Sequence, residues 1–495
     1  MEKGSDPLLP DPLLLSRTRS LTPHPLRVDG DFVLYWMTSA RRLRSNFALE
    51  RAVSLAREHR KPLVIFEPLR VGYAHANDRL HRFVIDGMAE RARALAATPV
   101  TYLPYIEPAP GDGRGLLTAL SQQALAVVTD DYPAFFLPRM LAAAARQVAV
   151  QFEAIDSNGI LPMHAAPKCF VTAFSHRAYM QTVLREHVQT WPAELQFSDL
   201  PRLSALPSAV TRRWRVTADA DLQTPAALIA SLPIDHSIAP VPLRGGEAAA
   251  QAALARFIAQ ALGHYTDDRN QPSVPGTSGL SPYLHFGHIG AHDIFSAVMN
   301  AEHWTTRKLA AKGGGKREGW WGVSPNAEAF LDQLITWREL GFNMCVQRPD
   351  DYDQYASLSN WARATLAAHA GDTRTHVYSR ADFEHANTHD PVWNAAQREL
   401  TQTGWMHNYL RMLWGKKILE WSRSPEEALE HMTTIMNTYA LDGRDPNSYT
   451  GYFWTLGRYD RPWAPEREIF GMIRYMSSDS TMKKLRMKPY LAKFG

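Results

Sequence analysis

Cysteine is nearly absent from this chain: its 495 residues include only Cys169 and Cys345. Two cysteines can form neither a disulfide framework nor a cysteine-based zinc site. We therefore expect no metal centre, and a reducing cytoplasm is the default compartment.

The sequence also lacks a large net charge, and its N-terminal segment lacks a long apolar run. The formal net charge is +4, which is a weak signal for a nucleic-acid partner, although a pI near 8.9 fits a local basic face. Prolines and charges interrupt the apolar residues of segment 1–28, which excludes a spanning helix and a signal peptide there. We expect this segment to be a poorly ordered arm and predict no membrane association.

No glycine-rich phosphate loop follows the first apolar run, so no dinucleotide fingerprint marks this region. Apolar runs and helical spacing nevertheless alternate up to residue 160. The predicted strands are 32–36, 63–66, 125–129 and 148–155, and the predicted helices are 46–58 and 82–97. Strands separated by helices imply a parallel, doubly wound sheet over residues 29–160.

The second half of the chain has a different pattern. Residues 161–241 mix prolines, short helical pieces and polar turns, which is typical of a long surface connection. Helical spacing without convincing strands continues over 248–262, 330–345, 395–421 and 425–438. The length exceeds what one compact core can hold. We therefore predict an α/β domain followed by a helical domain over residues 242–495.

Tryptophan is concentrated in that helical part, where eleven of the fourteen fall after residue 300. Trp414 and Trp421 are seven residues apart, which is two helical turns and puts both rings on one face, with Cα atoms about 10 Å apart. This spacing suits short electron hops between indoles. It suits core packing equally well.

Two further segments could bind a ligand. In Thr277-Ser278-Gly279-Leu280-Ser281-Pro282, small hydroxyl residues precede a proline, so we expect Ser281 to cap a helix whose free amides could bind a pyrophosphate. In Leu441-Asp442-Gly443-Arg444-Asp445-Pro446-Asn447, Asp442 could hold a ligand ring with Arg411 as its partner. The alternatives are a capped helix without ligand and a solvated acidic loop.

Taken together and in order, these segments resemble the photolyase and cryptochrome superfamily, with the class II cyclobutane pyrimidine dimer photolyases most similar. The resemblance extends from about residue 30 to the C-terminus. Its matches include Tyr35-Trp36-Met37, Ser278 to Gly287, Arg338-Glu339-Leu340, Asp390 to Asn394, Lys416 to Trp421, Leu441 to Asn447 and Arg474-Tyr475-Met476.

This resemblance implies light-driven repair of pyrimidine dimers in double-stranded DNA, by electron donation from excited, reduced FAD in the helical domain. It implies an electron relay from the flavin to the surface in the order Trp414, Trp393, Trp421. A second, antenna chromophore of deazaflavin or folate type stays unidentified, and we expect a monomer. The implied FAD contacts are Tyr265, Thr277, Ser278, Gly279, Leu280, Ser281, Arg338, Asn408, Arg411, Asp442, Asp445 and Asn447.

The resemblance also implies a DNA-binding face. Trp361 and Trp454 would line the lesion pocket, with Met412 near the lesion. Basic residues after Trp454 would contact phosphate, although a solvated charged tail is the commoner role of such runs. The expected basic rim is Arg458, Arg461, Lys483, Lys484 and Arg486.

Several residues depart from the family pattern. Met436 occupies the position of an asparagine near flavin N5, and Asn437 lies one step away, about 100° around a helix. Asp293 replaces an arginine that would pair with Asp460, so two carboxylates are expected to repel there. Asp332-Gln333 replaces a pair of acids. The main alternative is therefore a cryptochrome-like photosensor with little repair activity, and a third is a helical nucleic-acid-binding protein without cofactor.

Overall fold

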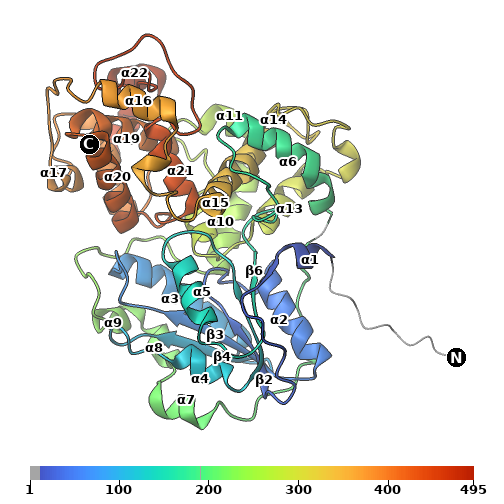
Figure 1. Cartoon of the computed structure of the whole chain (residues 1–495). Coiled ribbons are helices and arrows are strands. Elements are labelled where there is room, and N and C mark those ends of the chain that lie inside the picture. Colours follow the sequence, from blue (N-terminus) through green and yellow to red (C-terminus); the bar gives the residue numbers. More distant parts are fainter. Residues whose placement is uncertain (1–11, 190) are drawn as a thin grey trace.

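The computed structural model describes residues 12–189 and 191–495, and its N-terminal part is built on a six-stranded sheet (Figure 1). The strand order is β1-β6-β5-β2-β3-β4, and every neighbouring pair is parallel except β1 and β6. The strands are β1 (Thr18–Ser20), β2 (Phe32–Trp36), β3 (Leu63–Leu69), β4 (Thr101–Ile106), β5 (Ala124–Asp130) and β6 (Phe152–Ile155).

Helices cover both faces of this sheet, which explains the uninterrupted apolar run of β2. Val33 and Tyr35 pack in the same core cluster as α2, whereas Leu34 and Trp36 pack with α4 and α5. A strand between two helical layers needs apolar side chains on both faces. The doubly wound fold is confirmed. The helices of this part are α2 (Phe47–Glu58), α3 (Asp78–Leu95), α4 (Leu116–Ser121) and α5 (Leu137–Ala145).

The expectation of a poorly ordered arm is wrong for residues 12–28, and residues 1–11 lie outside the described residues. A short helix, α1 (Pro12–Ser16), leads into β1, which pairs antiparallel with β6 from Thr18 opposite Ile155. Strand β1 covers the free hydrogen-bonding edge of β6. The sequence analysis missed two strands, β1 and β4, which lie at the two edges of the sheet. Because both come earlier in the chain, the run 125–129 is part of the fifth strand, β5, and not of the third.

The connection between the two parts contains more structure than a surface linker. Met180 and Leu184 of α6 are buried in a core shared with the helical part. The boundaries near residues 160 and 241 stay predictions. The helices of this segment are α6 (Ala173–His187), α7 (Ser208–Arg213), α8 (Asp219–Gln223) and α9 (Pro225–Ala230).

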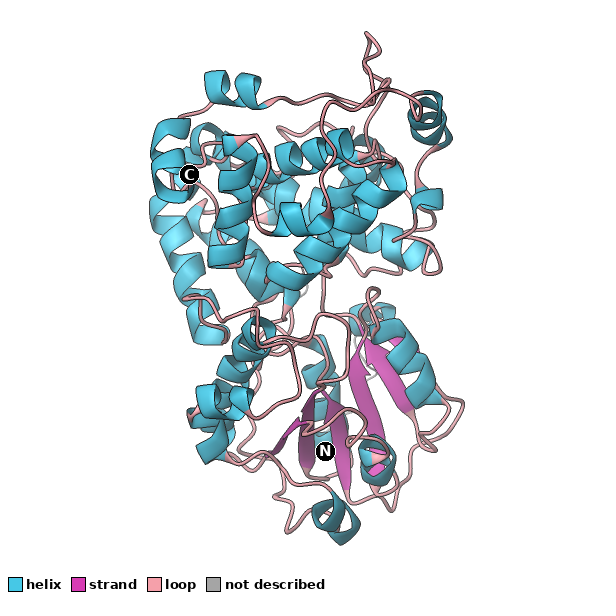
Figure 2. Cartoon of the chain, turned by 90° about the vertical axis from the view of Figure 1, so that its left-hand side faces the viewer, coloured by secondary structure: helices cyan, strands magenta, loops and turns pink. Residues whose placement is uncertain are grey.

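The C-terminal part is helical, as predicted, and lies at the opposite end of the molecule from the strands (Figure 2). Its helices begin with α10 (Glu247–Gln260), η1 (Leu262–His264), α11 (Tyr265–Asp268), α12 (Ser281–His285), α13 (Ala291–Ala301), η2 (Thr306–Lys308), α14 (Pro325–Leu331), the π-helix η3 (Asp332–Trp337) and α15 (Arg338–Gln347). They continue with η4 (Tyr355–Ser357), α16 (Asn360–Ala368), α17 (Arg380–Glu384), α18 (Pro391–Thr403), α19 (Asn408–Trp421), α20 (Pro425–Tyr439), α21 (Pro446–Thr455), α22 (Ser478–Lys484) and α23 (Met487–Phe494).

One predicted helical stretch is divided in two. Gly404 ends α18 in the left-handed conformation, with φ of 72°, so the run 395–421 belongs to α18 and α19 rather than to one helix. Among the described helices, none is long and apolar enough to cross a membrane.

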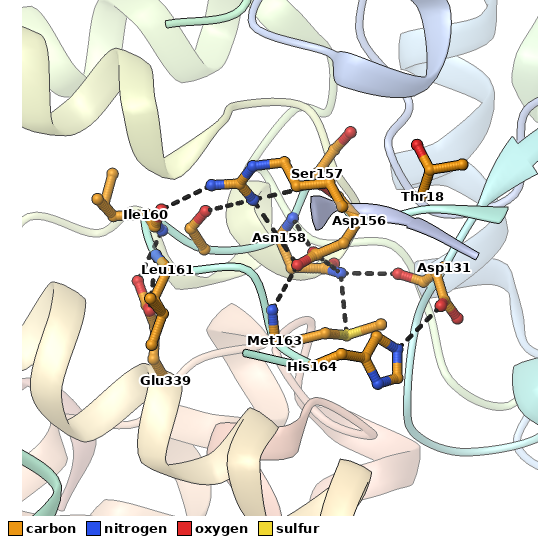
Figure 3. Close-up of polar contacts among 12 residues, drawn as sticks. Thr18, Asp131, Asp156, Ser157, Asn158, Ile160, Leu161, Met163, His164 and Glu339 are labelled. Carbon is orange, nitrogen blue, oxygen red and sulfur yellow. Dashed lines mark hydrogen bonds and ion pairs between the residues drawn. The ribbon is translucent and has the colours of Figure 1, made fainter. Parts of the chain in front are cut away.

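A buried turn after β6 joins the two parts (Figure 3). The carboxylate of Glu339, at the start of α15, accepts hydrogen bonds from the amides of Ile160 (2.8 Å) and Leu161 (3.2 Å). From the other side, the guanidinium of Arg17 donates to the carbonyls of Gly159 (3.1 Å) and Ile160 (2.6 Å). Burial raises the pKa of Glu339 to about 7, although the two amides and neighbouring arginines oppose that shift. Charged side chains thus bind both carbonyls and amides of the buried turn.

We expect Glu339→Gln to lower the free energy of unfolding by about 1–3 kcal/mol, because the new NH₂ group would face a buried amide donor. Chemical denaturation measures this loss, and limited proteolysis reports exposure of the segment between the two parts. Glu328→Gln is the matched control, since Glu328 accepts from the amides of Gly319 (2.6 Å) and Trp321 (3.0 Å) within the helical part. It should lower stability without opening the junction. Equal protease resistance in both variants would contradict the assigned role of Glu339.

Candidate active site

Three buried tryptophans form a continuous row across α18 and α19. Trp393 stacks on Trp414 with ring centroids 6.2 Å apart and planes 7° apart. The Trp393 ring also contacts Trp421 edge-on at 5.9 Å. The indole N–H of Trp393 donates to the carbonyl of Trp414, and that of Trp414 donates to Gln397 at 2.9 Å. These bonds fix the two stacked rings, and Trp393 lies between the two tryptophans of α19.

The outer end of this row is not at the surface, which corrects the expectation for Trp421. Only 2% of Trp421 is exposed. Its ring contacts half-buried Tyr378 at 5.6 Å and exposed His389 at 5.0 Å. The Tyr378 hydroxyl and His389 Nδ1 are 2.8 Å apart. These two side chains and Lys417, which lies over the same ring at 5.3 Å, contribute to the burial of Trp421.

Three of the predicted cofactor residues come together from distant segments. The hydroxyl of Ser281 donates to Asp442 at 2.7 Å, and Arg411 Nη2 lies 3.1 and 3.2 Å from the two oxygens of the same carboxylate. Ser281 is the first residue of α12 and caps no amide, so the predicted N-cap is wrong: its hydroxyl is committed to Asp442. In the described part of the chain, Arg411 Nε is buried without a hydrogen-bond partner.

The small residues before α12 border open space. Gly279 has φ of 66°, and a Cβ added there would meet no described atom within 4 Å. Ser278 Oγ accepts from the amide of Leu280 at 3.4 Å, and Thr277 is half-buried. Positive φ makes glycine the suitable residue at 279.

Four other predicted cofactor residues make none of the hydrogen bonds of this cluster and have contacts or exposure of their own. Tyr265 packs edge-on against Phe257 and Phe330. Arg338 donates to the carbonyl of Asn158 at 2.7 Å, at the junction of the two parts. Asn408 and Asn447 are exposed at the starts of α19 and α21.

Asp445 and Asn437 belong to buried hydrogen-bond networks. Asp445 accepts from the Tyr132 hydroxyl at 2.9 Å, and so connects the helical part to the sheet. Asn437 Oδ1 accepts from the amide of Arg444 at 2.9 Å, while the adjacent Met436 is fully buried on α20. The amide oxygen of Asn437 is thus committed to the turn that carries Arg444.

Trp361 and Trp454 lie on either side of one turn. The amide of Gly457 donates to the carbonyl of Trp454 at 3.0 Å, and a Cβ on Gly457 would lie 3.1 Å from the Trp361 ring. Both tryptophans and Met412 are half-buried. On the helix that carries Trp454, a Cβ at Gly451 would meet no described atom within 4 Å. Two partly exposed indoles therefore border a turn next to open space.

The basic rim needs one correction. Arg458 is 4% exposed, stacks on Phe453 at 3.6 Å and donates to the carbonyl of Tyr352, so it is not available to DNA. The other predicted rim residues are exposed: Arg461, Lys483, Lys484 and Arg486. Arg474, which carried no role in the sequence analysis, lies over the rings of Trp463 (4.0 Å) and Trp454 (5.4 Å).

The electrostatic conflict expected between Asp293 and Asp460 is absent. Asp460 pairs with Arg474 at 2.9 and 3.1 Å, whereas Asp293 accepts from the amide of Gly290 and from Ser45. The two carboxylates therefore have separate partners. Asp332 forms a buried ion pair with Arg177 of α6 at 2.7 Å, so it has a structural partner from the connecting segment.

A cavity of about 450 Å³ opens beyond the carboxyl ends of β2, β3 and β4. Aromatic rings and arginines contribute to its lining, together with the acidic residue Glu107. The aromatic residues and arginines include Trp36, Tyr105, Phe135, Arg41, Arg70, Arg114 and Arg444. Among the described residues, the indole N–H of Trp36 has no hydrogen-bond partner.

Comparisons with known proteins give one consistent result. The chain is 31% identical over 475 residues to a deoxyribodipyrimidine photo-lyase of Methanothermobacter thermautotrophicus, covering 96% of this chain and 97% of the relative. It is 32% identical over 490 residues to one of Oryza sativa subsp. japonica, covering 96% and 90%. A solved bacterial class III photolyase from Agrobacterium tumefaciens has a TM-score of 0.66 at 16% identity, covering 94% and 86%, which shows the fold alone. No protein-family model matches the chain.

We expect Asp442→Ala to lower the free energy of unfolding by about 3 kcal/mol, because it leaves the largely buried guanidinium of Arg411 without its carboxylate. Asp199→Ala is the control, since Asp199 and its partner Arg57 are more than a third exposed and pair at 2.8 Å. It should cost far less than Asp442→Ala, because solvent screens an exposed ion pair. Denaturant unfolding measures the free energy of unfolding of both variants. Equal losses would contradict the inference that Asp442 compensates the largely buried charge of Arg411.

Proposed function

The chain belongs to the deoxyribodipyrimidine photolyase family, and from that premise we propose that it repairs cyclobutane pyrimidine dimers in double-stranded DNA by light-driven electron transfer. The observation that carries this proposal is the row of Trp414, Trp393 and Trp421. Two of its rings are stacked within 7° of parallel, and all three are buried. Membership of class II stays a prediction.

The proposed cofactor is FAD, at the place where Ser281, Arg411 and Asp442 meet. Among the described residues, none pairs with Nε of Arg411 and none fills the space beside Gly279, which leaves a donor and room for a ligand and supports this location. When bound, FAD would supply the electron that opens the cyclobutane ring. The Arg411–Asp442 pair would orient the ring system, and the hydroxyls near Ser278 and Ser281 would bind phosphate.

The proposed lesion pocket is bordered by Trp361 and Trp454, with Met412 nearby. A dimer that leaves the duplex loses its stacking, and an indole face can replace part of that loss. Arg461, Lys483, Lys484 and Arg486 would bind the DNA backbone. Each phosphate contact would make binding more sensitive to salt.

We further propose that the cavity beyond β2, β3 and β4 binds the second chromophore. Ligands of parallel sheets commonly bind beyond the carboxyl ends of the strands, and 450 Å³ is within the usual size of such sites. Aromatic walls with several arginines favour a planar, anionic ligand. Deazaflavin and folate chromophores both meet this description.

We expect Trp393→Phe to block photoreduction of oxidised flavin, because Trp393 is the middle ring of the row. Chemically reduced variant protein should still repair a dimer-containing oligonucleotide under blue light. The measurements are flavin absorbance during illumination and the yield of repaired DNA. Trp304→Phe is the control, because the ring of Trp304 packs against Phe295 and Trp321 and not against a tryptophan of the row. Photoreduction without any repair by the wild-type protein would favour the photosensor instead.

We expect Trp361→Ala and Trp454→Ala each to weaken binding of damaged DNA by about 1–3 kcal/mol, the usual worth of one base stacked on an aromatic ring. Affinity for undamaged DNA and photoreduction should change little. Titration of both DNAs in the dark measures the effect, with bound flavin as the test of folding. A loss of melting temperature with unchanged preference for damaged DNA would indicate that these rings only pack.

A further inference from the structure

Lys416 is a fully buried lysine in the middle of α19, with 0% of its surface exposed. The two helices around it pack closely, since a Cβ added to the adjacent Gly415 would lie 2.5 Å from the side chain of Thr455 on α21. Lysine is almost never fully buried, because its charge loses hydration there. An apolar side chain would fill this position at lower cost, so the ammonium group requires an explanation.

The ammonium group of Lys416 makes two contacts with the end of α21. Its Nζ donates to the carbonyl of Thr455, the last residue of that helix, at 2.6 Å. The C-terminal end of a helix favours a cation. The same Nζ lies over the indole of Trp454, 4.9 Å from the ring centroid, within reach of a cation–π interaction. One charge therefore fixes both the helix end and the indole.

Trp454 is half-buried whereas Lys416 has no exposed surface. The lysine therefore lies on the side of the indole that faces the protein interior. The partly exposed guanidinium of Arg474 also lies over this ring, with its Cζ 5.4 Å from the centroid. No step of the proposed electron transfer uses Lys416. Its position behind Trp454 connects it with lesion binding instead.

Two charged groups act on Lys416, both from the segment that follows α21. Asp460 is largely committed elsewhere, because it accepts from Arg474 and from the indole N–H of Trp463 at 3.0 Å. Burial lowers the pKa of Lys416 to about 7, with Asp460 opposing the shift and Arg474 adding to it. From α20, the uncharged Met432 accepts from the hydroxyl of Thr455, the residue whose carbonyl binds Lys416.

We propose that Lys416 is a positioning residue for lesion recognition, and that its protonated ammonium group holds the indole of Trp454 in the orientation that stacks on a pyrimidine dimer. This inference rests on the proposed function, because it takes Trp454 as the residue that stacks on the lesion. Loss of the proton removes the cation–π interaction and weakens the bond to Thr455.

The direction of the pH dependence follows from the pKa. Lys416 is protonated below about pH 7 and neutral above it. The preference for damaged over undamaged DNA is therefore strongest at low pH and falls as the pH rises through 7. Dividing the affinity for damaged DNA by the affinity for undamaged DNA at each pH cancels the pH effects that are common to both DNAs.

The test is a dark titration of wild-type protein, Lys416→Met and Lys416→Arg with dimer-containing and undamaged oligonucleotides between pH 6 and 9. We expect the wild-type preference to fall about ten-fold over this range, which is within the worth of one stacked base. Lys416→Met should show a weak preference at every pH. Lys416→Arg keeps its charge and should show a strong preference at every pH.

The neighbouring lysine supplies the control. Lys417 pairs with Glu420 at 2.8 Å and lies over Trp421 rather than Trp454, so Lys417→Met should keep the wild-type pH profile of damaged-DNA preference. Melting temperature and bound flavin show which variants fold. If Lys416→Met does not fold, the comparison of Lys416→Arg with wild type decides.

The outcomes separate this inference from the proposed function. A folded Lys416→Met or Lys416→Arg variant with the wild-type pH profile would overturn the role of Lys416 alone. A wild-type protein that shows no preference for damaged DNA at any pH would reject the proposed function, and this inference with it.

Discussion

The turn after β6 is the constraint on which the arrangement of both parts depends. Its backbone is buried between the sheet and the helices, where an unpaired amide or carbonyl is costly. Glu339 and Arg17 supply the missing partners. Glu339 lies in the first turn of α15, and a Cβ on Gly341 of α15 would lie 2.7 Å from Thr450 of α21, so the same contact fixes α21 relative to the sheet. The position of α21, the helix that carries Trp454, therefore depends on the turn after β6 in the N-terminal part of the chain.

A second connection between the parts passes through the acidic turn. Asp445 of this turn binds Tyr132, which follows β5, and Arg444 borders the cavity at the sheet. Asp442, three residues before Asp445, pairs with Arg411 at the proposed flavin site. One turn thus contributes to the interface between the parts, to the proposed antenna cavity and to the proposed flavin site. A change in this turn would affect all three.

The helical part contains buried charges that stability alone does not explain. Breaking such a pair is costly, yet well-packed apolar residues often serve stability equally well. Asp442 with Arg411, and Lys416 beneath Trp454, lie next to the places where ligands are proposed to bind. This distribution suggests that the charges serve orientation and recognition. The buried tryptophan row differs. Its indoles pack as large apolar groups and are proposed to transfer electrons, and burying them removes no charge from water.

The sequence by itself determined the class of fold and the helix that Trp414 and Trp421 share. The apolar run at 32–36 indicated a strand covered on both faces, and the seven-residue spacing of Trp414 and Trp421 placed them on one helix, because these patterns depend on the period of the backbone. Tertiary structure decided which side chain meets which. Periodicity could not show that Arg458 turns inward, or that Asp460 pairs with Arg474. Such partners are set by the packing of separate segments, which no local pattern records.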